Sequence, residues 1–118
     1  MKKDYNKIYT IDEIKEITKK VFEKYKIKTA YIFGSYARGE ATSKSDIDIM
    51  IVKEGSSIRT LLNLTHLENE LEELFNKKID LIIEETYSKI SLSENEYGKL
   101  AKELFYNELK KDRRKIFG

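Results

Sequence analysis

The sequence predicts an α/β protein in which helices pack on a small sheet. Three short runs rich in β-branched and aromatic residues, 29–33, 46–52 and 79–83, have the composition of strands. They alternate with longer segments in which apolar residues recur every three or four positions, which is the period of a helix. The chain has 118 residues, no Pro and 5 Gly. That length is typical of one domain, so we expect a single domain over residues 1–118.

Two of the helices are predicted from capping signals and apolar spacing. Thr10 and Glu13 have the spacing of a capping box, which predicts that a helix begins here. Its expected inward residues are Ile11, Ile14, Ile17, Val21 and Tyr25. A second helix is expected to begin at Ser56 or Ser57 and to run to about Asn76. Its expected inward residues are Leu61, Leu64, Leu67, Leu71, Leu74 and Phe75.

The last helix is predicted in the same way. Ser93 and Glu96 form a further capping-box signal, and Leu92 and Tyr97 have the spacing of a hydrophobic staple. The expected apolar face of this helix consists of Leu100, Ala101, Leu104, Phe105 and Leu109. An apolar face on the first or last helix could belong to the core or to an interface, so an oligomer stays open.

Composition excludes several kinds of site. The chain has no Cys, which excludes disulfides, zinc ribbons and thiol catalysis. Its single histidine, His66, excludes metal sites built from several histidines. Because His66 lies off the main Leu face of its helix, we expect a surface residue.

Charge and hydropathy limit the partners. No apolar run approaches the roughly 18–20 residues of a membrane helix, and no signal-peptide core follows the first lysines, so we expect a cytoplasmic protein without membrane contact. The net charge is +2, although residues 29–109 carry nine Lys and Arg against fifteen Asp and Glu. So small a net charge gives little affinity for a phosphate backbone, and we expect no direct nucleic-acid binding. The acidic middle of the chain favours a site built from carboxylates.

Polar residues and a glycine stand at the ends of the predicted strands. Gly34 and Ser35 follow the first strand. Asp46 and Asp48 open the second strand, where alternation puts both side chains on the face opposite its isoleucines. Asp80 lies within the third strand. An aspartate inside an otherwise apolar strand is costly unless a partner compensates its charge, so we interpret these residues as one site.

This combination predicts a site for a metal ion and a triphosphate. Carboxylate oxygens suit Mg²⁺, which completes its shell with water and phosphate. Gly34 has no side chain, so the backbone can approach a phosphate oxygen closely, and Ser35 adds a hydroxyl. The turn after it, through Arg38, would present backbone N–H groups to the anion. Asp80 could hold a second ion and take a proton from an attacking hydroxyl.

The segment GSYARGEATSKSDIDIMI, residues 34–51, resembles the minimal nucleotidyltransferases of the DNA polymerase β superfamily. Gly34 and Ser35 are followed, after ten residues, by Asp46, one further residue and Asp48, and this spacing matches the signature of that superfamily. Asp80 falls where the third carboxylate of the superfamily is usually found. The resemblance implies the α/β fold of the polymerase β-like nucleotidyltransferases, a small mixed sheet flanked by helices.

The resemblance also implies an activity. A nucleoside monophosphate, AMP from ATP, would be transferred to a hydroxyl, and pyrophosphate would be released. Asp46 and Asp48 would ligate Mg²⁺, with two ions expected, and Asp80 would complete the site and act as base. Gly34 and Ser35 would hold the triphosphate, and Arg38 would either contact a phosphate or pair with Glu40.

A partner follows from the resemblance as well. Small members of this family are typically paired with a HEPN-domain toxin, and several are similar to protein adenylyltransferases that modify a tyrosine of that toxin and silence its RNase activity. The resemblance therefore implies an antitoxin that adenylylates its partner. Two alternatives stay open: a non-catalytic antitoxin that neutralises its partner by binding, and a transferase acting on a small molecule, as in the aminoglycoside-modifying relatives.

Two further features carry open interpretations. The basic segment 110–118 could be a solvated tail, a docking segment for the partner, or a contact to RNA held by the toxin. The eight tyrosines are expected mostly at helix caps and at the rim of the core, with base stacking by Tyr31 or Tyr36 as the alternative.

Overall fold

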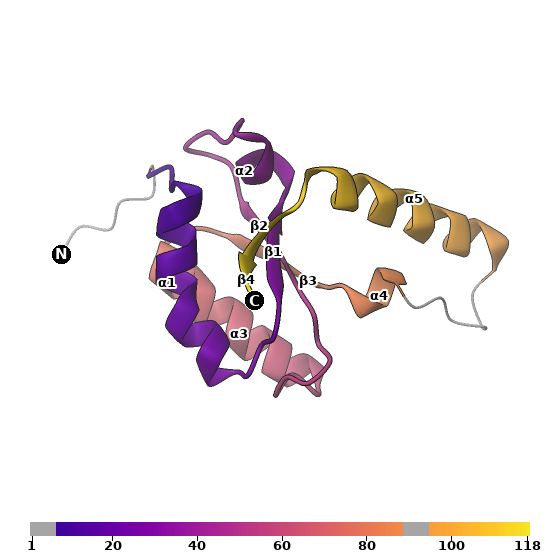
Figure 1. Ribbon diagram of the computed structural model, residues 1–118, viewed down its shortest axis with the longest axis horizontal. Coiled ribbons are helices and arrows are strands. Elements are labelled where there is room, and N and C mark those ends of the chain that lie inside the picture. The colour runs from indigo at the N-terminus through magenta and orange to yellow at the C-terminus, as the bar shows by residue number, and fades with distance from the viewer. Residues whose placement is uncertain (1–6, 89–94) are drawn as a thin grey trace.

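The computed structural model describes residues 7–88 and 95–118, in which helices surround one sheet (Figure 1). In chain order the elements are α1 (Ile11–Lys24), β1 (Ala30–Phe33), α2 (Gly34–Arg38), β2 (Ile47–Ile51), α3 (Leu61–Phe75), β3 (Ile79–Ile83), α4 (Glu85–Ser88), α5 (Glu96–Asp112) and β4 (Arg114–Phe117). The three strands expected from the sequence are thus confirmed, and β4 is an addition.

The four strands form a mixed sheet in the order β3-β2-β1-β4. β1 runs antiparallel to both of its neighbours, β2 and β4, whereas β2 and β3 are parallel. A parallel pair needs a crossover connection, and α3 provides it. The expected α/β class and small mixed sheet are therefore confirmed.

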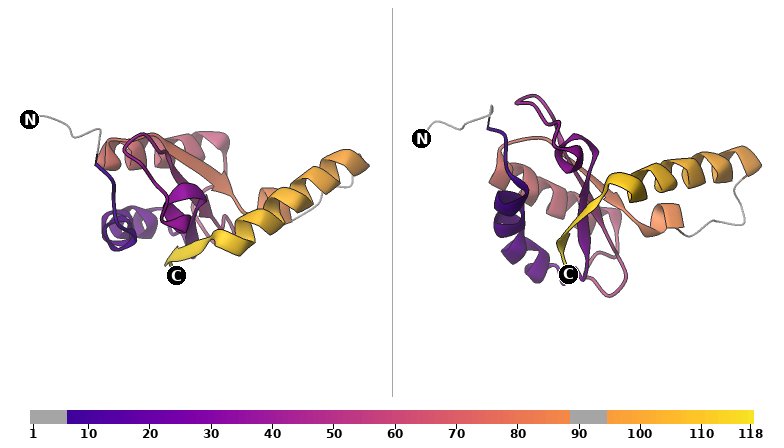
Figure 2. Two further views of the ribbon diagram at one scale, coloured as in Figure 1. Left: turned by 90° about the horizontal axis from the view of Figure 1, so that it is seen from above. Right: turned by 45° about the horizontal axis from the view of Figure 1, so that its top comes forward.

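The two faces of the sheet have different cover. The isoleucines of β2 that alternate with Asp48 pack against α1 and α3, and this main core is completed by β1 and β3. The opposite face carries a smaller core in which Leu109 of α5 packs against Phe33 and Met50. Figure 2 shows the same division, with α1 and α3 on one side of the strands and α5 on the other. The fully buried members of the main core include Ile14, Phe22, Ile32, Ile49, Leu67, Leu71 and Phe75.

Helix α1 forms as the sequence predicts. The backbone N–H of Glu13 donates to the Thr10 hydroxyl at 3.1 Å, and the backbone N–H of Thr10 donates to the Glu13 carboxylate at 2.9 Å. Ile14 and Val21 are buried in the core, and Ile11, Ile17 and Tyr25 pack at its margin. The capping box thus begins the helix where its apolar face meets the sheet.

Helix α3 begins later than expected, because Thr60 caps it instead of Ser56 or Ser57. The backbone N–H of Asn63 donates to the Thr60 hydroxyl at 3.2 Å, and the Asn63 side chain accepts from the Thr60 backbone at 3.0 Å. Ser56 instead closes a turn by donating to the carbonyl of Lys53 at 2.6 Å.

The inward face of α3 is narrower than expected. Leu67, Leu71 and Phe75 are buried, but Leu61 and Leu74 are 78% and 49% exposed. At 100° per residue these two leucines fall on opposite margins of the buried stripe, so the sheet does not cover them. His66 is exposed, as the sequence predicts.

Helix α5 departs most from the expectation. Asn95 caps it by accepting from the backbone N–H of Gly98 at 2.7 Å, and the expected Ser93 and Leu92 lie outside the described residues. Tyr97 is 88% exposed, and its predicted staple with Leu92 lies outside the described residues as well. Of the expected apolar face only Leu109 is buried, and the residues that are exposed instead are Leu100, Ala101, Leu104 and Phe105. The reason is visible in Figure 1: most of α5 projects beyond the strands, and only its last turns reach them.

The basic segment 110–118 is ordered within the fold. Its first residues complete α5, and Arg114–Phe117 form the edge strand β4. Ile116 is buried in the main core, and Phe117 packs its ring against that of Phe22 at 5.5 Å between centroids. A solvated tail is therefore wrong for this segment. Within the described part of the chain, no helix has the length and apolar character needed to cross a membrane.

Candidate active site

The strand register brings two of the predicted carboxylates together. Asp48 of β2 and Asp80 of β3 are paired residues of the parallel ladder. Asp46 lies just before β2, two residues from Asp48, so the alternation of side chains puts both on the same face. That is the face on which α5 packs, away from α1 and α3. Asp46 and Asp80 are exposed, whereas Asp48 is half-buried between them.

Gly34 lies against Asp48. It follows β1 directly, and its φ of +68° is a left-handed conformation that side chains disfavour. A Cβ built at this position would collide with a carboxylate oxygen of Asp48. Glycine is therefore required at this position for two reasons: the left-handed backbone conformation and the lack of space for a side chain. The close approach joins the turn after β1 to the carboxylates of β2 and β3.

The carboxylates repel one another. The pKa of Asp48 is raised to about 6, chiefly by burial and then by the nearby charges of Asp80 and Asp46, while Arg38 opposes the shift. Asp48 thus carries an uncompensated negative charge above that pH. A cation bound between these groups would remove the repulsion.

Ser35 and Arg38 lie on α2, where the sequence predicts a turn. Ser35 is half-buried, and its backbone carbonyl accepts a hydrogen bond from Glu40 at 2.9 Å. Tyr36 is buried, which removes it from any exposed stacking role, and Tyr31 is covered by the guanidinium of Arg113 at 3.9 Å from its ring centroid. The stacking alternative is therefore wrong for Tyr36, and Arg113 already occupies one face of the Tyr31 ring.

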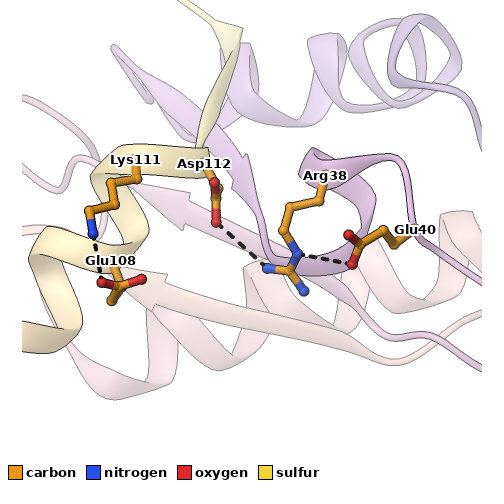
Figure 3. A network of polar contacts seen from close by, with 5 residues as sticks. All are labelled: Arg38, Glu40, Glu108, Lys111 and Asp112. Atoms are coloured by element: carbon orange, nitrogen blue, oxygen red, sulfur yellow. Dashed lines mark hydrogen bonds and ion pairs between the residues drawn. The ribbon is translucent and has the colours of Figure 1, made fainter.

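Arg38 connects α2 to the last helix. Its Nε lies 3.2 Å from a carboxylate oxygen of Glu40, and its guanidinium lies 3.9 Å from Asp112 of α5 (Figure 3). The predicted pair with Glu40 is thus present. The contact with Asp112 has no signal in the sequence, because no spacing relates the end of α5 to the residues after β1.

The donor set suits a divalent cation of the Mg²⁺ type. Asp48 and Asp80 are paired on neighbouring strands, Asp46 lies two residues before Asp48, and the charges of both neighbours raise the pKa of Asp48. Among residues 7–88 and 95–118, no three Asp, Glu or His side chains converge closely enough to hold one ion by themselves. Mg²⁺ uses few carboxylates and takes its other ligands from water and phosphate, so Asp48 with one neighbour meets its needs.

A fold with a mixed sheet, a glycine turn after the first strand and paired aspartates on the next two defines a nucleotidyltransferase. The family model described as "Polymerase beta, Nucleotidyltransferase" matches residues 13–105. The chain belongs to this family, and it is a nucleotidyltransferase.

Curated relatives agree with this assignment. In Methanocaldococcus jannaschii, "Putative protein adenylyltransferase MJ0126" is 47% identical over 94 residues, which cover 73% of this chain and 94% of the relative. "Protein adenylyltransferase MntA" of Thermococcus cleftensis is 37% identical over 78 residues, covering 63% of this chain and 77% of the relative.

Solved structures share the fold. One, described as "Crystal structure of the toxin-antitoxin with AMP-PNP", superposes with a TM-score of 0.64 at 18% identity and covers 88% of this chain and 73% of its own. Another, described as "Structure of putative minimal nucleotidyltransferase", gives a TM-score of 0.61 at 21% identity and covers 90% of this chain and 95% of its own.

Proposed function

We propose that this protein is an antitoxin that transfers AMP from ATP to a hydroxyl, a tyrosine, of a partner HEPN-domain toxin. The observation that carries the transfer chemistry is the placement of Asp48 beside Asp80 with Gly34 against it. Two findings support the choice of acceptor and role. The relatives are named as protein adenylyltransferases, and a structure of the same fold is described as a toxin–antitoxin complex with AMP-PNP.

Each residue has a role in this proposal. Asp46 and Asp48 would hold Mg²⁺, and Asp80 would complete the site. When bound, the metal, expected as two ions, would neutralise the charge of the triphosphate and of the carboxylates around it. Gly34 and Ser35 hold the triphosphate, because the bare backbone at Gly34 leaves room for phosphate oxygens.

The reaction balances with these groups alone. The acceptor hydroxyl gives its proton to the carboxylate of Asp80, which is exposed at the edge strand and therefore accessible to a protein substrate. The hydroxyl oxygen forms a bond to the α-phosphorus of ATP, and the bond from that phosphorus to the bridging oxygen breaks. Pyrophosphate leaves with the electron pair, and Arg38 lies on α2 where it could contact a departing phosphate once it leaves Glu40.

The experiment uses the protein with labelled ATP, Mg²⁺ and the product of the neighbouring gene as the candidate partner. Mass spectrometry of the partner should show added AMP on a tyrosine. Sub-stoichiometric amounts of the protein should then silence the partner's RNase activity, because one enzyme molecule modifies many partners. Asp80→Asn should abolish the transfer and retain binding to the partner. Asp12→Asn, a change of the same kind at an exposed position of α1, should transfer AMP as the unchanged protein does.

The result that would overturn the proposal is protection that stays one-to-one in the presence of ATP and survives Asp80→Asn. That outcome would assign the protein to antitoxins that act by binding. Transfer of AMP to a small hydroxyl compound with an unmodified partner would instead support the small-molecule alternative.

A further inference from the structure

A cavity of about 280 Å³ lies between the turn after β1 and the last turns of α5. One wall is made by Phe33, Gly34 and Arg38, and α5 contributes the other wall with Phe105, Leu109 and Asp112. We propose that this cavity receives the nucleoside half of the nucleoside triphosphate, with the base against Phe105. The inference rests on the nucleotidyl transfer proposed above and adds the element that recognises the nucleoside.

The position of the cavity follows from Gly34. The same glycine lines the cavity and lies against the carboxylate of Asp48. A triphosphate bound at Gly34 and the carboxylates would therefore have its sugar and base one step away, toward α5. Four further cavities, of about 210 to 610 Å³, are lined neither by Gly34 nor by any of the three aspartates.

The walls have the chemistry of a base-binding site. Phe33 and Leu109 are buried in the smaller core and form a fixed apolar floor. Phe105 is 43% exposed, an unusual position for a phenylalanine, and its ring is held by that of Tyr87 at 5.0 Å between centroids. Because Tyr87 supports the ring from one side, Phe105 offers an aromatic surface that is already in place. Stacking on such a surface binds any base through its π face.

The charges around the cavity distinguish the nucleoside from the phosphates. Glu108 and Asp112 both line it, and their carboxylates would repel a triphosphate. Carboxylates accept hydrogen bonds from ribose hydroxyls and from an exocyclic amino group. Arg38 also lines the cavity and lies 3.9 Å from Asp112, so it is the positive charge available there to a phosphate. The volume is near the lower limit of ligand pockets, which suits a base and sugar better than a whole nucleotide.

An aromatic side chain of the protein acceptor is the competing occupant. Two carboxylates at the cavity favour a ligand with several hydroxyl and amino donors, and a nucleoside has these whereas a tyrosine side chain has one. The experiment below separates the two occupants.

The test measures direct binding, with Mg²⁺ and without any acceptor protein, by calorimetry. The probes are ATP, which has the nucleoside, and inorganic tripolyphosphate, which does not. Phe105→Ala should weaken the binding of ATP about tenfold, the loss expected from one stacking ring, and leave the binding of tripolyphosphate unchanged. Leu104→Ala is the matched control, because Leu104 is the neighbouring residue on α5, is 57% exposed and does not line the cavity. It should change neither affinity.

A second variant does not depend on the packing of Phe105. Glu108 is exposed and forms an ion pair with Lys111 at 2.9 Å, so Glu108→Gln should fold normally. It should weaken the binding of ATP severalfold, because ribose hydroxyls donate stronger hydrogen bonds to a charged carboxylate than to an amide oxygen. The weaker binding of 2′,3′-dideoxy-ATP, which lacks these hydroxyls, should not change.

The outcomes are separable. If ATP binds and neither variant alters its affinity, the inference is wrong and the proposed function stands. If Phe105→Ala raises the KM for the protein acceptor and leaves the affinity for ATP unchanged, the cavity belongs to the acceptor. If the unchanged protein binds neither ATP nor tripolyphosphate, the proposed function itself fails, and the inference fails with it.

Discussion

Asp48 and Asp80 stand side by side on two parallel strands, and each lies in a strand whose neighbouring residues are apolar. The arrangement places like charges together on a sheet that gains its stability from burying isoleucines. Such a pair destabilises the free protein, because the charged form of Asp48 is disfavoured by burial and by its neighbour. The repulsion is relieved when a cation or a proton binds. The same carboxylates that destabilise the free protein therefore favour the binding of a cation.

The first prediction concerns the pH dependence of stability. The pKa of Asp48 is raised to about 6 in the folded protein, so its protonated form favours folding. Its contribution to stability is complete below the ordinary aspartate pKa of about 4 and is lost as the pH rises through 6. The free energy of unfolding of Asp48→Asn should therefore equal that of the unchanged protein near pH 4 and be about 1 kcal/mol higher at pH 7.5. This difference is smaller than the full pKa shift would give, because solvent screens part of the repulsion.

Urea unfolding of both proteins between pH 4 and 8, without divalent cations, measures this difference. Asp12→Asn should not be more stable than the unchanged protein, because Asp12 lies in the first turn of α1, where a negative charge is favourable. Addition of Mg²⁺ should raise the melting temperature of the unchanged protein and have less effect on Asp48→Asn. A difference that stays flat across the pH range would show that Asp48 is not strained by its neighbours.

The second prediction uses two glycines with similar backbones and different surroundings. Gly34 and Gly39 have φ values of +68° and +74°, but a Cβ would meet Asp48 at the first position and open space at the second. Gly39→Ala should cost about 1 kcal/mol, the strain of a left-handed alanine, and keep full nucleotide transfer. Gly34→Ala should cost more and abolish the transfer, because the methyl group displaces the carboxylate.

The double variant Gly34→Ala with Asp48→Ala identifies the cause. It should recover part of the lost stability, since the collision is removed, without recovering transfer. Thermal unfolding and a labelled-ATP assay measure the two effects. Equal stability of Gly34→Ala and Gly39→Ala would mean that the approach to Asp48 is looser than the structure has it.

The site was more predictable from the sequence than the helices that surround it. Gly34, Asp48 and Asp80 were found because a strand's alternation and a glycine's special backbone are local properties. The start of α3 could not be predicted in this way, because Thr60 and the two serines before it are all acceptable caps. The choice between them depends on the turn that Ser56 makes with Lys53.

The C-terminal part of the chain depended on contacts that no local pattern reports. The periodicity of α5 predicted a buried face, but burial requires a sheet beneath it, and most of the helix extends past the strands. The basic composition of 110–118 hid the strand β4, whose pairing with β1 spans most of the sequence. The cavity beside Gly34 also depends on this long-range pairing, because Asp112 lies at the cavity only when β4 returns the chain to the sheet.

The third prediction concerns the contacts that hold α5 and β4 in place. Arg113, between these two elements, donates to Glu84 at 2.6 Å, and the hydroxyl of Tyr106 donates to the same carboxylate oxygen at 2.7 Å. The side chains of Arg113 and Glu84 are only 18% and 16% exposed. Burial raises the pKa of Glu84, but the hydrogen bonds from Arg113 and Tyr106 outweigh it and hold that pKa below its usual range.

Arg113→Met should therefore leave a half-buried carboxylate without its cation and destabilise the protein by about 2–3 kcal/mol at pH 7. Because a lowered pKa stabilises the fold above the ordinary glutamate pKa, this loss should shrink as the pH falls below about 4, where Glu84 becomes protonated in both proteins. Lys24→Met serves as the control, because it breaks an ion pair with Glu70 in which the lysine is 63% exposed, and it should cost at most about 0.5 kcal/mol.

Urea unfolding gives the free energies of both variants, and hydrogen exchange should show faster exchange in β4 for Arg113→Met alone. Equal losses for the two variants would mean that burial of the Arg113 pair adds nothing, and that α5 and β4 are held by Leu109 and Ile116 instead.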